Sequence, residues 1–104
     1  MDIRKYQLQD GRIPFDVWFK ALRDKRAKAK ILIRLKRVEL GHIGDGKSVG
    51  EGVYELRITE GQAYRIYYGY AGNEIVLLLS GGNKSTQQKD IKIAKQYWSH
   101  YNAK

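Results

Sequence analysis

Three runs of apolar, β-branched and aromatic residues follow one another in the second half of the chain, at residues 53–58, 63–70 and 74–80. Short glycine-containing segments separate them, and runs of this length joined by such turns are typical of an antiparallel meander. The third run is apolar at every position from Ile75 to Leu79. We therefore expect its strand to be covered on both faces, as a central strand is.

The first two runs place their side chains on two faces of the sheet, because successive residues of a strand point to opposite sides. One face takes apolar and tyrosine side chains, namely Tyr54, Leu56, Ile58, Tyr64, Ile66, Tyr68 and Tyr70. The other face takes Glu55, Arg57, Arg65 and Tyr67. We expect the first face to be buried. We expect the second, with Arg65 exposed in the middle of the sheet, to carry the functional side chains.

Helices are predicted on either side of this meander. Pro14 suits the first position of a helix, where its missing N–H costs nothing. The aromatic and aliphatic side chains that follow it recur on one helical face, and this stripe is expected to be core. Asp24 can cap a second helix over residues 25–40, whose exposed faces carry many lysines and arginines. Ser85 and Gln88 have the capping-box spacing that begins a third helix.

Two remaining segments complete the expected order. Residues 3–8 alternate loosely and predict a short first strand, whereas the glycine-rich residues 41–50 predict a loop. The expected order is therefore β-α-α-β-β-β-α in one domain over residues 1–104. This is an α+β fold, with a small, mainly antiparallel sheet, a helical hairpin on one face and a C-terminal helix.

The charge balance points to an anionic partner. Twenty Lys and Arg against eleven Asp and Glu give a net charge of +9, which attracts nucleic acid, acidic protein segments or anionic lipid. Lipid is the weakest of the three, because no basic helix here has a bulky apolar face, and we expect no membrane partner. A basic surface that serves solubility alone is the plainer alternative. The basic second helix can likewise either follow phosphates or simply be solvated.

The chain has no cysteine, so disulfides and thiolate metal sites are excluded, and a reducing compartment is indicated. The N-terminus has no apolar signal-peptide core, and the longest aliphatic run is too short to span a bilayer. We therefore expect a cytoplasmic protein. No second histidine or carboxylate stands at metal spacing from His42, so we expect neither a metal nor another cofactor.

Four segments carry a resemblance to a known family: GVYELRI at 52–58, YRIYY at 64–68, IVLLL at 75–79 and GGNKS at 81–85. With Asp90, Ile91 and Ala94 they resemble the RelE/ParE superfamily of toxins, and within it the addiction-module killer proteins related to the phage-derived HigB-like group. The resemblance also covers the segment around Pro14 and the basic helix, so it extends over nearly the whole chain. It implies a small sheet backed by two N-terminal helices, with a C-terminal helix at the active edge.

The resemblance also implies a toxin of a type II toxin–antitoxin pair. RelE-like members cleave mRNA in the ribosomal A site without a metal, whereas ParE-like members poison DNA gyrase by binding it. By this likeness, Arg57, Arg65 and Lys84 match basic residues that RelE-like nucleases keep on the first meander strand, on the second strand and just after the last strand. Two positions depart from RelE: Glu55 stands in place of a second lysine, and Asp90 stands near its C-terminal tyrosine.

Metal-free RNA cleavage needs a base for the 2′-hydroxyl, cations for the charge that develops on phosphorus, and an acid for the leaving oxygen. Arg57, Arg65 and Lys84 can supply the cations, and a guanidinium can hold two phosphate oxygens at once. We expect Arg65 to be the main stabilising cation. Tyr67 can stack on a base or donate a proton, so Tyr67, Arg57, Lys84 and His100 are the candidate RNA-binding residues.

The general base is left open between Glu55, Asp90 and His100. Glu55 lies on the same face as Arg57, and a carboxylate beside arginines stays ionised, as a weak base must. The plainer alternatives are that Glu55 and Arg57 only pair along the strand, and that Asp90 only interacts with the dipole at its helix start.

These observations predict a cytoplasmic toxin that cleaves mRNA, on the ribosome, and that a cognate helix-turn-helix antitoxin neutralises. By resemblance, the complex with the antitoxin would bind operator DNA. Two alternatives remain: a ParE-like gyrase poison that acts by protein binding, and an RNA-binding module without cleavage.

Overall fold

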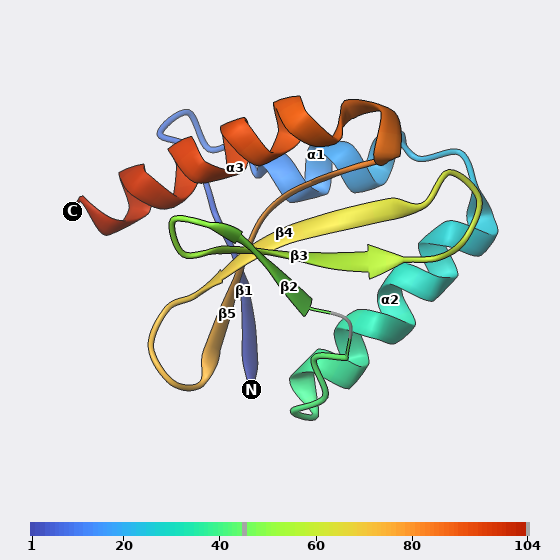
Figure 1. Cartoon of the computed structure of the whole chain (residues 1–104), viewed down its shortest axis with the longest axis horizontal. Coiled ribbons are helices and arrows are strands. Elements are labelled where there is room, and N and C mark those ends of the chain that lie inside the picture. The colour runs from blue at the N-terminus through green and yellow to red at the C-terminus, as the bar shows by residue number, and fades with distance from the viewer. Residues whose placement is uncertain (45, 104) are drawn as a thin grey trace.

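Residues 1–44 and 46–103, which the computed structural model describes, form a five-stranded sheet with helices on both faces (Figure 1). The elements in chain order are β1 (Asp2–Lys5), α1 (Pro14–Ala21), α2 (Lys25–Glu39), β2 (Gly46–Gly50), β3 (Val53–Ile58), β4 (Tyr64–Tyr70), β5 (Ile75–Gly82), the short 3₁₀ helix η1 (Lys84–Thr86) and α3 (Gln87–Asn102). The expected α+β fold is confirmed, including the helical hairpin and the C-terminal helix.

The strands lie in the order β1-β5-β4-β3-β2. β3, β4 and β5 form the predicted antiparallel meander, and β1 pairs in parallel with β5. The loop prediction for residues 41–50 is wrong at Gly46–Gly50, which pairs as β2 with β3. All three β2 residues before Val49 are exposed, so the sequence of β2 carries no apolar alternation that could have revealed the strand. Ladder hydrogen bonds at a sheet edge are enough to form such a strand.

Strand boundaries follow the long-range pairing. β3 has the predicted bounds, whereas β5 continues to Gly82 because Arg65 and Ile66 of β4 extend the ladder to Gly82 and Gly81. The first strand ends at Lys5 instead of residue 8, because its pairing with β5 ends there. The backbone N–H of Leu8 then donates to the carbonyl of Arg12 and closes a turn.

The helix caps show one confirmed and one incorrect prediction. Asp24 caps α2, since its Oδ1 accepts from the backbone N–H of Ala27 at 3.0 Å. The Ser85–Gln88 capping box is wrong. Asn83 accepts from the backbone N–H groups of Ser85 and Thr86, and the Thr86 hydroxyl accepts from the backbone N–H of Asn83. Asparagine is as strong an N-cap as serine, so the box forms two residues earlier and η1 precedes α3.

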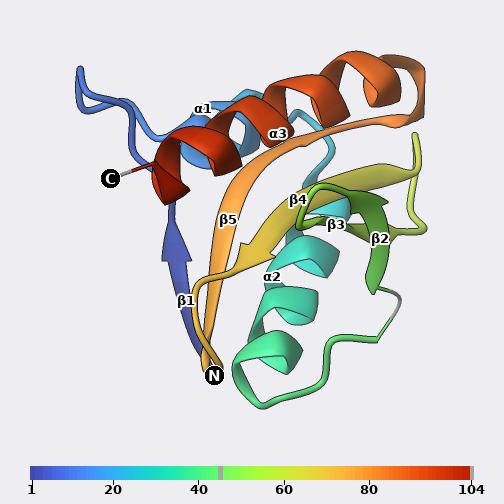
Figure 2. The same ribbon diagram turned by 60° about the vertical axis from the view of Figure 1, so that its left-hand side comes forward.

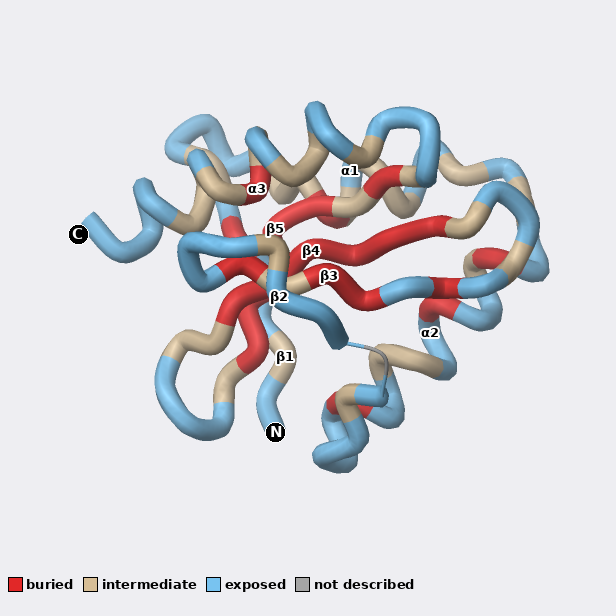
Figure 3. Tube along the Cα trace, viewed as in Figure 1, coloured by how far each residue is buried: buried red, intermediate tan, exposed pale blue. Residues whose placement is uncertain are grey.

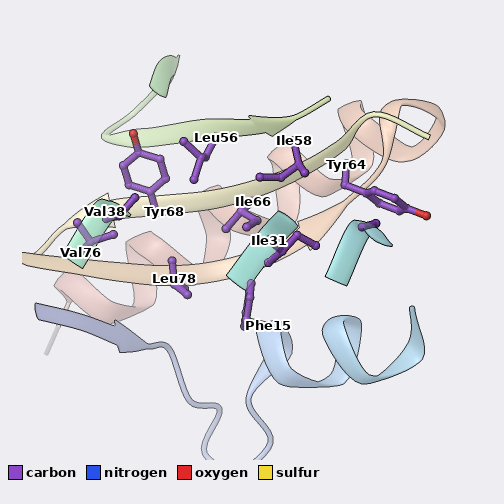
Figure 4. Packing of buried hydrophobic residues seen from close by; sticks show 11 residues of the cluster. Phe15, Ile31, Val38, Leu56, Ile58, Tyr64, Ile66, Tyr68, Val76 and Leu78 are labelled. Atoms are coloured by element: carbon purple, nitrogen blue, oxygen red, sulfur yellow. The ribbon is translucent and has the colours of Figure 1, made fainter. Parts of the chain in front are cut away.

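The larger core lies between the sheet and the α1–α2 hairpin. Figure 4 shows Leu56, Ile58 and Ile66 of the sheet packed near Ile31 of α2 and Phe15 of α1. Tyr64 and Tyr68 are also part of this core. The prediction that this face of the sheet is buried is confirmed.

A second core covers the other face. Val53, Tyr67, Leu77 and Leu79 of the sheet pack with Ala94 of α3. β5 is therefore buried on both faces, as predicted, and Figure 3 shows the central strands buried along most of their length. The expectation that the second face is open, with Arg65 exposed, is wrong, because α3 lies on it. No helix in residues 1–44 and 46–103 is long and apolar enough to cross a bilayer.

Candidate active site

Glu55 of β3 lies on the face of the sheet that α3 covers, and only 1% of its surface is exposed. Its Oε1 accepts a hydrogen bond from Arg57 Nε at 3.2 Å, and its Oε2 accepts one from Gln87 Nε2 at 2.8 Å. Arg65 Nε forms an ion pair with Oε2 at 3.4 Å. This buried carboxylate therefore links β3, β4 and the start of α3, and we call these four residues the Glu55 cluster.

The strand register explains why the cluster needs a carboxylate. Arg57 lies directly opposite Arg65 in the β3–β4 ladder, and Glu55 is opposite Tyr67. Like charges directly across two strands are destabilising. Glu55 Oε1 contacts one guanidinium and Oε2 contacts the other, so the carboxylate offsets their repulsion.

Arg65 is 6% exposed, which contradicts its expected position on an open surface. Its Nη1 donates to the carbonyl of Ala63 at 3.0 Å. A buried charge is stable only when it is paired and hydrogen-bonded, and Glu55 and Ala63 supply these partners. Arg65 is therefore part of the support beneath the surface and has little access to a phosphate in this conformation.

Arg57 and Lys84 are two exposed cations on this side, and Lys47 of β2 is another, opposite Glu55 in the β2–β3 ladder. The Arg57 side chain is 45% exposed, and Lys84 is exposed on η1. Asn83 Nδ2 donates to Gln62 Oε1 at 2.9 Å, which ties the start of η1 to the β3–β4 turn. Gly82, two residues before Lys84, is opposite Arg65 in the β4–β5 ladder. The structure thus brings Glu55, Arg57 and Arg65 into contact and places Lys84 two residues beyond the β5 position that pairs with Arg65.

Asp90 lies on the first turns of α3, where its Oδ2 accepts from the hydroxyl of Thr86. A Cβ at residue 82 would collide with this carboxylate, so Gly82 permits the close approach of α3 to β5. The structure therefore gives Asp90 a role in holding the helix start against the sheet. The Asp90 carboxylate therefore lies next to Gly82, the β5 residue that pairs with Arg65 in the β4–β5 ladder.

Tyr67 is fully buried beneath α3, so it has no face on which a base could stack. Among the described residues its hydroxyl has no hydrogen-bond partner. Burial, followed by the nearby charges of Glu55 and Asp90, raises the pKa of Tyr67 above its ordinary value, so the phenol stays neutral. The expectation that Tyr67 lies on an open face is wrong, because its ring belongs to the second core.

His100 lies in the last turn of α3, at the opposite end of the helix from Gln87 of the Glu55 cluster. Thirteen residues of helix separate it from Gln87, about 20 Å at 1.5 Å per residue. His100 lines an open groove with Lys5 at the end of β1 and with residues of the β1–α1 connection, including Arg12. The structure does not bring it together with the other candidates, and this removes it as a base for chemistry at the cluster.

Comparison with known proteins adds to this geometry. The model of a family described as "Phage derived protein Gp49-like" matches residues 17–99. The chain belongs to the Gp49-like family. This is a toxin-like family of the toxin–antitoxin type, related to RelE. A chain of Haemophilus influenzae (strain Rd), named "Uncharacterized protein", is 54% identical over 83 residues, which cover 80% of this chain and 84% of that one.

The matched segment of this Gp49-like protein contains the whole Glu55 cluster together with Lys84 and Asp90. Gln87 was not among the sequence-based candidates. Nothing in its local pattern marks it, because its contact with Glu55 spans 32 positions and depends on how α3 meets β3. Within residues 1–44 and 46–103, no group of three or more His, Cys, Asp or Glu side chains could hold a metal ion.

The arrangement separates positioning groups from groups that can touch a substrate. Glu55 is too deeply buried to reach a 2′-hydroxyl, but its bond to Arg57 Nε fixes that guanidinium at the surface. An oriented guanidinium with free N–H groups is suited to a phosphate or a carboxylate. Arg57 and Lys84 can therefore contact an anion, while Glu55, Arg65 and Gln87 hold Arg57 in place.

Proposed function

We propose that this Gp49-like protein is the toxin of a type II toxin–antitoxin pair and that it cleaves mRNA, on the ribosome, without a metal. The observation that supports this most directly is the Glu55 cluster, in which a buried carboxylate orients Arg57. Preorganised cations of this kind stabilise charge that develops on phosphorus. Arg57 and Lys84 would contact the phosphate, and the buried charge of Arg65 would stabilise it electrostatically without contact.

Asp90 is the carboxylate that remains as a candidate base in this proposal. It lies at the start of α3, half-buried, beside Gly82. Its Oδ2 is engaged by the Thr86 hydroxyl, which leaves the other oxygen to accept the proton of a 2′-hydroxyl. Glu55 acts by positioning Arg57, and His100 takes no part.

A helix-turn-helix antitoxin is the proposed partner, with operator DNA bound through the complex. The net charge of +9 favours an acidic neutralising segment. Such a segment would cover Arg57 and Lys84 directly. It would interact with Arg65 only through long-range electrostatic attraction, because the Arg65 side chain is buried.

The second candidate is a gyrase poison that acts by protein binding. The burial of Arg65 and Tyr67 favours it, since these side chains are unavailable to an RNA substrate in this conformation. It would use the exposed cations as a docking surface and would need no chemistry.

Brief expression of the chain distinguishes the two candidates. A nuclease should halt translation and leave new transcript ends, whereas a gyrase poison should leave mRNA intact and produce gyrase-dependent DNA breaks. Arg57→Ala should lower the cleavage rate by about 10²–10³, as the loss of a preorganised donor does. Arg23→Ala removes an exposed arginine from the α1–α2 connection and is the matched control. Transcript cleavage that is equal in both variants would contradict the assigned role of Arg57.

A further inference from the structure

A groove of about 360 Å³ lies between α2 and the end of β3, and it shares Arg57 with the Glu55 cluster. Its lining includes Lys30, Arg34, Arg37 and Arg57 around Ile33 and Ile58. Figure 2 shows α2 and the β2–β3 pair from the side, with α3 away from α2 at the top. In the described part of the chain, the pairing of β2 with β3 begins at Gly46 and Leu56. Arg57 and Ile58 therefore follow the paired segment and border the groove.

The groove carries a surplus of positive charge. Lys30 Nζ pairs with Glu60 at 3.1 Å, Arg34 Nη2 donates to the carbonyl of Ile43 at 3.2 Å, and Arg57 pairs with Glu55. Within residues 1–44 and 46–103, the guanidinium of Arg37 has no ion-pair or hydrogen-bond partner. Among the described residues the four cations of the groove therefore have two acidic partners, Glu60 for Lys30 and Glu55 for Arg57, and Glu60 is shared with Arg26.

The groove also exposes an aliphatic side chain. Ile33 is 54% exposed, although it lies on a helix whose other side packs in the core. None of the described lining residues is aromatic, so a nucleobase would find no ring to stack on. Cations around an exposed isoleucine match a ligand that has carboxylates and a branched aliphatic side chain. This combination favours an acidic protein segment over RNA.

We propose that the groove between α2 and β3 is the docking surface for an acidic segment of a protein partner, with an aliphatic side chain packed on Ile33. Its carboxylates would pair with Arg37 and Arg57. Arg57 also belongs to the Glu55 cluster, so a segment bound here occupies the exposed guanidinium that the nuclease proposal assigns to the phosphate. In naming this partner as the neutralising antitoxin, the inference rests on the proposed function, but the docking surface itself does not.

The test is direct binding to the purified full chain. The probe is a short synthetic peptide of alternating glutamate pairs and leucine pairs, with polyglutamate of the same length as a charge-only control. Arg37→Ala and Ile33→Ser alter the groove, and both side chains are exposed, so the fold should persist. Lys36→Ala and Leu32→Ser are matched controls, because they remove the same charge or a similar aliphatic group from neighbouring exposed positions outside the groove.

We expect Arg37→Ala and Ile33→Ser each to weaken binding of the leucine-containing peptide by about fivefold, equivalent to about 1 kcal/mol. Lys36→Ala and Leu32→Ser should leave it unchanged, and added salt should weaken it. Equal binding of polyglutamate, or equal losses in groove and control variants, would overturn the proposal in favour of non-specific charge attraction. Binding of a single-stranded RNA oligonucleotide that is lost in Arg37→Ala, without peptide binding, would overturn it in favour of an RNA groove.

The same variants separate this inference from the proposed function. Ile33→Ser should weaken peptide binding about fivefold while transcript cleavage in cells stays intact, since Ile33 lies outside the Glu55 cluster. If the parent chain binds the peptide through the groove but cleaves no mRNA, the docking surface stands and the nuclease proposal fails. If it cleaves mRNA but binds no peptide, the nuclease proposal stands and the docking surface fails.

Discussion

Replacement of Glu55 by glutamine tests whether this carboxylate supports both the fold and the orientation of Arg57. The substitution keeps the side-chain volume and removes the charge. It leaves the buried guanidinium of Arg65 without its counter-ion and weakens the bond to Arg57. Removing one partner of a buried ion pair typically costs about 3–5 kcal/mol. Gln87 can still donate to the new amide oxygen, so we expect a loss of about 3 kcal/mol, at the lower end of that range.

This loss is measurable because a domain of this size has a total stability of about 5–15 kcal/mol. It corresponds to a fall in Tm of at least about 12 °C, since each kcal/mol shifts Tm by about 4–8 °C in small domains. The assay is urea unfolding followed by tryptophan fluorescence, with the slope m compared to confirm that the variant folds to the same compactness. The control is Glu39→Gln, because the pair of Glu39 with Lys36 is exposed and 3.6 Å long. It should cost less than about 1 kcal/mol.

A double variant isolates the ion pair from other effects. Arg65→Met together with Glu55→Gln removes both buried charges, so its cost should be smaller than the sum of the two single costs by at least about 1 kcal/mol. A loss below about 1 kcal/mol for Glu55→Gln, with an additive double variant, would refute the reasoning, because it would place Glu55 among ordinary surface carboxylates.

Three further predictions test individual features. Tyr67→Phe should leave transcript cleavage unchanged and change the free energy of unfolding by less than about 1 kcal/mol, because the hydroxyl has no partner among the described residues; a large loss of cleavage would return Tyr67 to the active site. Gly82→Ala should cost about 1–3 kcal/mol in urea unfolding, because its Cβ would meet the Asp90 carboxylate, and Asp90→Ala in the same chain should restore part of it; an additive result would contradict the steric explanation. Asp24→Ala should cost about 1 kcal/mol through loss of the α2 cap, and thermal unfolding that matches the parent would show that this cap is dispensable.

The periodicity of the sequence determined which residues share a face of the sheet. The alternation in residues 53–58 assigned Leu56 and Ile58 to one face and Glu55 and Arg57 to the other, and the two cores confirm this. The apolar run in β5 likewise predicted a strand covered on both sides. The role of Asp24 as the N-cap of α2 was predicted from its position just before the apolar stripe of that helix. Each of these features depends on the direction of a side chain or on a cap within one turn, which local sequence encodes.

What covers each face was decided by the tertiary structure. Arg65 has the same local pattern whether it faces water or a helix, and only the docking of α3 onto β3 and β4 buried it. The same docking brought Gln87 to Glu55, buried the ring of Tyr67 and left His100 about 20 Å from Gln87 along the helix. β2 likewise depended on its long-range partner, since its own residues show no apolar alternation. Burial and cross-element contacts depend on residues distant in the chain, so a local pattern carries no information about them.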